Sequence, residues 1–391
     1  MSAQPTTRKR IEYIALLRGW AVIVMVETHV FNATLIPALR ESGVFKVQTF
    51  LNGLVAPSFL FASGLVFAVT TRRKLHEYLS FRWPLFRQII RLLFVALIGY
   101  LLHLPKFNYY HLRYEAGDPA WRIFFQVDVL QCIAVSLLLM QALLFFTKTE
   151  RRLYTVITGL AIAIVFIAPA IWDIDFAQWL PFALAAYVNG LHGSLFPLFP
   201  WSAFVFAGAI LGYRYLRARD ADMENPAGDA TGNMMQWTAM AAVGLLIASF
   251  ALHPFASLLY PQYDYWRASP SFFLLRVALV ILLCAGLFLF ERRRGVSRSS
   301  VVTLMGRESL LVYAAHLMAI YGKLGGSTFA DRVGETFGVW EAWLTTLILL
   351  GLMFLLALAW DRVRKGPPLL KPAVQGVLFL GFLLFFFYGP R

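Results

Sequence analysis

The amino-acid sequence predicts an all-α protein that crosses a membrane many times as one polytopic helical bundle. Of its 391 residues, 59% are hydrophobic, 16% are aromatic and only 14% are charged, which is more apolar surface than a soluble domain can bury. Apolar segments of about 20 residues, long enough for a helix to cross a bilayer core roughly 30 Å thick, recur along the chain. These observations argue against a soluble globular domain.

Eleven apolar segments are expected to form membrane-spanning helices. In chain order they are 14–36, 50–70, 84–104, 123–146, 153–172, 196–214, 234–253, 271–290, 302–322, 341–360 and 372–388. The polar stretch 215–232 is too short and too charged to bury a core, so it is expected to be a cytoplasmic linker within a single domain, 1–391. The first segment is too long for a signal peptide, and it is therefore expected to stay in the mature protein.

Basic residues predict the orientation of the bundle, because Lys and Arg stay preferentially on the cytoplasmic side during insertion. A cytoplasmic N-terminus places most of the 35 Lys and Arg residues inside, among them the clusters at 8–10, 72–74, 148–152, 291–294 and 361–365. Eleven crossings then leave the C-terminus outside. The net charge of +14 is thus explained by the orientation of the helices in the membrane. Because the basic residues are spread over separate loops, no nucleic acid is expected as a partner.

The first predicted span carries ionisable residues on one face. Arg18, Val22, Met25 and His29 follow helical spacing, with Arg18 at the cytoplasmic end and His29 roughly 16 Å further along the axis. Ionisable groups within spans are costly and usually face a bundle interior or a cavity. We therefore expect this face to point inward, although Arg18 alone is also compatible with a membrane anchor and His29 with a structural hydrogen bond.

Two further spans each place an ionisable residue, His316 or Asp128, toward the outer side. Ser309, Tyr313 and His316 share a helical face in 302–322, and Asp128 lies near the outer end of 123–146. In this topology the other histidines of the outer half or the outer loops are His29, His103, His111, His192 and His253. This asymmetry predicts an outward-facing polar chamber. For the last four taken singly, tolerance of histidine near the interface is the simpler explanation. No metal site is predicted.

Five segments, in this order along the chain, resemble the membrane acyltransferases related to heparan-alpha-glucosaminide N-acetyltransferase. They are RIEYIALLRGWAVIVMVETH at 10–29, NGLVAPSFLFASGLVFAV at 52–69, VDVLQCIAVSLLLM at 127–140, LFPLFPWSAFVFAGAILGYRY at 195–215 and GRESLLVYAAHL at 306–317. The resemblance implies an eleven-helix bundle that takes an acyl group, commonly acetyl, from cytosolic acyl-CoA. The acceptor, often a sugar or glycoconjugate, receives it at the far face. A multi-pass protein of a bacterial cytoplasmic membrane is therefore expected, in contact with membrane lipid.

The resemblance also implies catalytic residues. His29 matches the first-helix histidine of bacterial members, and His316 matches the histidine of the SLLVYxxH-like segment. Histidine suits the role of base near neutral pH, since its unperturbed pKa is about 6.5. Asp128 would orient an imidazole if the first and fourth spans meet. Direct transfer and a route through an acyl-histidine are both open.

Cationic residues are expected to bind the co-substrate acyl-CoA (acetyl-CoA). Arg18 matches the arginine of the family's arginine-glycine pair, and Arg72, Arg73 and Lys74 lie at the same inner mouth. Such side chains form charge-assisted hydrogen bonds with nucleotide phosphates.

Two alternatives use the same residues differently. In a membrane transporter or flippase, the intramembrane His and Asp side chains would form a proton relay. A non-catalytic scaffold is the third hypothesis, because Ala15 and Ala56 stand where relatives often carry acidic residues. The acceptor, the acyl length and the oligomeric state, including a homodimer, are left open by the sequence.

Overall fold

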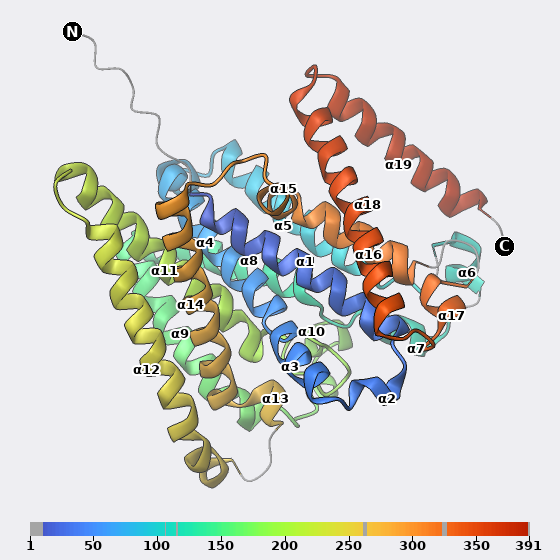
Figure 1. Cartoon of the computed structure of the whole chain (residues 1–391), viewed down its shortest axis with the longest axis horizontal. Helices are drawn as coiled ribbons and strands as arrows, with labels where there is room; N and C mark the ends of the chain where they lie inside the picture. The colour runs from blue at the N-terminus through green and yellow to red at the C-terminus, as the bar shows by residue number, and fades with distance from the viewer. Residues whose placement is uncertain (1–10, 106, 115, 261–263, 323–326, 390–391) are drawn as a thin grey trace.

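The computed structural model describes residues 11–105, 107–114, 116–260, 264–322 and 327–389, which form a helical bundle (Figure 1). Nine helices in these ranges are long and apolar enough to cross a membrane. The β pairing within the same ranges is a single isolated bridge between Leu35 and Phe337. The predicted all-α, multi-pass class is confirmed.

Ten long helices build the bundle. They are α1 (Tyr13–Thr34), α4 (Val55–Leu79), α5 (Trp83–Leu102), α8 (Val129–Thr147), α9 (Glu150–Ile171), α11 (Leu198–Glu224), α12 (Ala230–Leu259), α14 (Pro270–Arg294), α18 (Val339–Lys365) and α19 (Leu370–Tyr388). All but α11 belong to the nine apolar helices, with α3 (Gly43–Asn52) and α4 counted as one. The count of eleven crossings and the orientation of the termini stay predictions.

The predicted span 302–322 is broken into α15 (Val301–Arg307) and α16 (Ser309–Tyr321). The break lies at Glu308, whose backbone leaves the helical region at φ −97° and ψ 21°. The guanidinium of Arg364 on α18 lies 2.8 Å from the buried Glu308 carboxylate, and Arg307 lies 3.6 Å from Asp361. The end of α18 therefore compensates the charges that the break brings into the bundle.

The predicted linker 215–232 is wrong in its extent. Helix α11 continues to Glu224 and α12 begins at Ala230, so only residues 225–229 connect them. Asp222 accepts hydrogen bonds from the backbone of Ala230 and Thr231 at 2.5 and 3.1 Å, and Asp229 caps α12 by accepting from Gly232 at 3.0 Å. The charges that marked the segment as a linker are therefore helix-capping and helix-surface groups.

Glycines allow close backbone approach at two helix crossings. On α4 and α11, a Cβ at Gly64 would overlap the carbonyl oxygen of Val205, and α11 is approached as closely at Gly208. Helices α1 and α15 meet in the same way through Gly19 and Gly306. Small residues allow such close backbone approach between membrane helices. The second crossing places the residue before Gly19, Arg18, against the start of α16.

The basic end of the bundle is the end at which α1 begins and α4, α11, α14 and α18 finish. Ion pairs join its helices, including Arg292 with Asp229 at 2.6 Å and Arg298 with Glu12 at 3.2 Å. We call the other end, at which α1 finishes, the opposite end. Helix α12 forms one edge of the bundle beside α14, and α19 lies on the other edge next to α18, with none of its described residues buried (Figure 1).

Candidate functional site

A cavity of about 450 Å³ lies at the opposite end between α1, α5 and α16. Its polar lining residues are His29, His103, Asp128 and Tyr321. Ala120 and Ile123 of the short helix α7 (Asp118–Phe124) also line it, so the loop after α5 contributes a wall. We call this space the histidine cavity.

The two histidines expected to act together are neighbours. Their ring centroids lie 5.3 Å apart, and the ring of Tyr321 lies 5.9 Å from that of His29. His316 is fully buried, and its Nδ1 lies 2.8 Å from the carbonyl oxygen of Val312. Its Nε2 has no hydrogen-bond partner among the described residues. His29 therefore lines the cavity, and the buried His316 imidazole lies next to it without being part of the lining.

Asp128 is the N-cap of α8 and joins three elements. One carboxylate oxygen accepts from the backbone of Val129 at 2.7 Å, and the other accepts from the Tyr313 hydroxyl at 3.0 Å. The same second oxygen lies 3.6 Å from Nε2 of His103. The imidazole that Asp128 contacts is thus His103 rather than His29. Sequence reasoning did not select His103. This residue lies near the outer end of the predicted span 84–104, and that end is level with Asp128.

The residues before Asp128 are braced by the segment between α10 (Phe182–Ala185) and α11. The Gln126 side chain donates to the carbonyl of His192 at 3.2 Å, and the backbone of Val127 donates to the Ser194 hydroxyl at 3.0 Å. His192 in turn lies 2.8 Å from Asp175, and this hydrogen bond holds the pKa of the exposed Asp175 carboxyl below its usual value. The brace fixes the position from which Asp128 enters the histidine cavity.

A second cavity, of about 260 Å³, lies nearer the basic end between α1, α4, α5, α8 and α16. Arg18, Arg91 and Gln88 line it, together with the hydroxyl groups of Ser63, Thr70 and Ser309 and a larger set of apolar side chains. Arg18 donates to the Ser309 hydroxyl at 2.5 Å. We call this space the cation-lined cavity. Sequence reasoning did not select Arg91, an exposed side chain at the cavity, because its place in the lining depends on how α5 packs against α4 and α8.

The other predicted cations lie outside this cavity. Arg72, Arg73 and Lys74 are on the last turns of α4 and none of them lines it. Arg72 contacts Glu150 at 2.7 Å and also contacts Asp220. Its charge is therefore compensated, and it ties α4 to α9 and α11.

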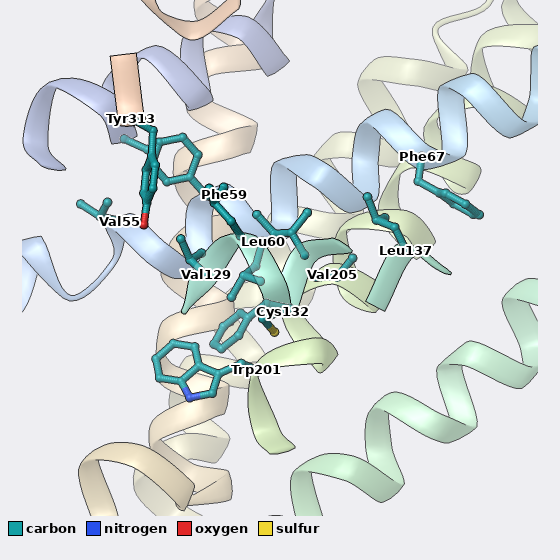
Figure 2. Packing of buried hydrophobic residues seen from close by; sticks show 14 of the residues in the cluster. Val55, Phe59, Leu60, Phe67, Val129, Cys132, Leu137, Trp201, Val205 and Tyr313 are labelled. Carbon is teal, nitrogen blue, oxygen red and sulfur yellow. The ribbon is translucent and has the colours of Figure 1, made fainter. Parts of the chain in front are cut away.

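Tyr313 separates the two cavities. Its ring lines the cation-lined cavity beside Phe59 and Val129 (Figure 2), and its hydroxyl bonds to Asp128, which lines the histidine cavity. The acidic residue of α1, Glu27, is buried against α3, where it accepts from the Gln48 amide. Helix α1 thus supplies Arg18 to one cavity and His29 to the other.

A comparison with protein families matches residues 10–255 to the family described as "Heparan-alpha-glucosaminide N-acetyltransferase, catalytic". The chain belongs to this family. The matched region includes Arg18, His29, His103 and Asp128, whereas His316 lies beyond it. A search of curated proteins gave no match. The described ranges contain no group of three or more His, Cys, Asp or Glu side chains placed to hold a metal ion.

Family membership places the chain among membrane acetyltransferases, in agreement with its apolar helices. The acyltransferase class and the multi-pass membrane character that the sequence predicted are therefore confirmed. The identities of the donor, the acceptor and the catalytic groups go beyond the match, and they rest on the two cavities.

Proposed function

We propose that the protein transfers an acyl group, commonly acetyl, from cytosolic acyl-CoA to a sugar or glycoconjugate at the opposite face of a bacterial cytoplasmic membrane. One observation carries the proposal. A single helix within the family match places Arg18 in the cation-lined cavity and His29 in the histidine cavity, and one tyrosine separates the two spaces. The basic end would face the cytosol, in line with the distribution of Lys and Arg.

The cation-lined cavity has the chemistry to hold the donor. Arg18 and Arg91, which line the cavity, would bind phosphate oxygens, and Arg73 and Lys74 on the last turns of α4 would add positive charge at the basic end. The cavity's mixture of hydroxyl groups and apolar walls suits a thin pantetheine arm. When bound, acyl-CoA supplies a thioester that is already activated for acyl transfer. Arg72 is left out of this assignment because two carboxylates already compensate it.

The histidine cavity would supply the acid–base chemistry for the acceptor. His29 would take the proton from an acceptor hydroxyl or amine as that group forms its bond to the acyl carbon, and the thioester sulfur would leave as the CoA thiolate with the electrons of the broken C–S bond. His316, fixed by its bond to Val312, would hold the His29 ring from behind. Asp128 would orient His103 and stabilise its charged form, which gives the cavity a second imidazole for proton transfer.

Acetyl transfer by the reconstituted protein tests the proposal. Full-length protein in vesicles is supplied with labelled acetyl-CoA on the basic-end side and with amino sugars or glycoconjugates on the other side. We expect CoA release that depends on the acceptor, together with labelled acceptor. A transporter would instead move solute across the vesicle without releasing CoA. Absence of both CoA binding and CoA release with every acceptor class would contradict the proposal.

A further inference from the structure

A third space lies apart from both cavities, between α12 and α14 near the basic end. It is a groove of about 550 Å³, and none of its lining residues lines either cavity of the proposed site. Its walls are largely apolar and include Met235, Ala239, Leu282 and Leu289. Only 17% of the apolar stretch of α12 is buried inside the bundle. The rest of this stretch is exposed at the edge of the molecule, where a membrane-spanning helix contacts the bilayer.

Small residues open the groove. Ala239 on α12 and Ala285 and Gly286 on α14 line it. A Cβ built on Gly286 would meet no atom within 4 Å, so this position faces empty space rather than a packed neighbour. The groove therefore has room for a flexible apolar chain lying alongside the two helices.

The basic end of the groove carries one uncompensated positive charge. Of its three charged lining residues, Arg292 and Asp229 pair with each other at 2.6 Å. The third, Arg293, is exposed and forms no ion pair or hydrogen bond with any residue in the part of the chain that the structure describes. The amide side chains of Asn233 and Gln236 lie in the same lining. Apolar walls that end in a free guanidinium and two amides match a phosphate ester with an acyl chain.

We propose that this groove binds one anionic phospholipid from the leaflet at the basic end. One acyl chain lies along Ala239 and Gly286, and the phosphate contacts Arg293. The net charge of the lining residues, +1, selects a headgroup with a net charge of −1 over a zwitterionic one. Because α12 packs mainly on α14, a lipid seated between them stabilises this edge of the bundle.

Native mass spectrometry of the detergent-purified full-length protein, with phosphatidylglycerol or phosphatidylethanolamine added, tests the site. We expect one retained phosphatidylglycerol and weaker retention of phosphatidylethanolamine. Arg293→Gln should weaken phosphatidylglycerol binding roughly fivefold and remove the preference. Gly286→Leu should fill the groove and weaken binding of both lipids.

Two matched controls distinguish the groove from the general surface. Arg294→Gln removes the adjacent positive charge, which does not line the groove, and Gly244→Leu adds the same side chain at a glycine of α12 that also faces open space but lies outside the groove lining. Both should bind lipid as the wild type does. Thermal unfolding shows that each variant is folded, and phosphatidylglycerol should raise the melting temperature of the controls but not of Gly286→Leu. Equal binding of the two lipids, or unchanged binding by both groove variants, would overturn the proposal.

Discussion

The two cavities differ in how their charged groups are partnered. In the histidine cavity, Asp128 is shared between the Tyr313 hydroxyl and His103, and His29 lies against His316. In the cation-lined cavity, Arg18 bonds to a neutral hydroxyl, and the carboxylate that attracts its charge, Glu308, already forms its ion pair with Arg364. Groups that can pass protons to one another suit acid–base chemistry, whereas cations without anionic partners suit binding of an external anion. The contrast assigns chemistry to one space and donor binding to the other.

The largest expected effect is on chemistry at the opposite end. His29→Gln should lower kcat by about 10²- to 10⁴-fold, because it removes the proposed base while leaving Arg18 in place. The KM for acetyl-CoA should change little. Steady-state rates of CoA release measure both constants.

His253→Gln is the matched control for this variant, since His253 is also near the opposite end but lines neither cavity. Its rate should equal that of the wild type. Unaltered turnover by His29→Gln would remove His29 from the mechanism. A much larger loss of kcat in His103→Gln than in His29→Gln would assign the role of base to His103, the imidazole that Asp128 contacts.

Arg18→Gln should act on donor binding instead. Loss of a charge-assisted hydrogen bond costs about 1.5–3 kcal/mol, so the KM for acetyl-CoA should rise roughly 10- to 100-fold with kcat changed only a few-fold. Arg362→Gln, an exposed basic-end arginine outside both cavities, serves as the control. A fall in kcat at unchanged KM would place Arg18 in the chemistry and erase the proposed division between the cavities.

Tyr313→Phe tests the boundary between the two spaces. The variant keeps the ring that lines one cavity and removes the hydroxyl that bonds to Asp128 in the other. We expect a loss in kcat of about fivefold, equivalent to one hydrogen bond of roughly 1 kcal/mol, with KM for acetyl-CoA unchanged.

Tyr154→Phe controls for loss of a buried hydroxyl, since Tyr154 is buried outside both cavities. A Tyr313→Phe enzyme with wild-type kinetics would show that the Asp128 contact does not couple the cavities.

The smallest effect on activity is expected at Arg72. Arg72→Gln removes the contacts to Glu150 and Asp220, which should lower the melting temperature by a few degrees at most, since each half-exposed ion pair contributes about 1 kcal/mol or less. Differential scanning fluorimetry and donor kinetics measure the two consequences separately. A KM increase as large as that of Arg18→Gln would return Arg72 to the donor site.

Local helical spacing was enough to predict which faces point inward. Val22 and Met25, which lie between Arg18 and His29 on one face of α1, are buried, and so are Ser309, Tyr313 and His316 on α16. These predictions succeed because helical periodicity is a property of neighbouring residues along one segment. The same reasoning could not detect the break at Glu308, where the compensating Arg364 comes from a distant helix.

The sequence by itself determined the membrane class, the family and the inward faces of α1 and α16. Composition, the order of motifs and helical periodicity can all be read along the chain without knowing how its helices pack. Only the tertiary structure decided that Asp128 contacts His103, that Arg91 rather than Arg72 lines the cation-lined cavity, and that Tyr313 lies between the two spaces. Those facts depend on the close crossings at Gly19 and Gly306 and on the braced loop before α8. A contact between helices is set by their relative rotation and depth, which the spacing of residues within one helix does not encode.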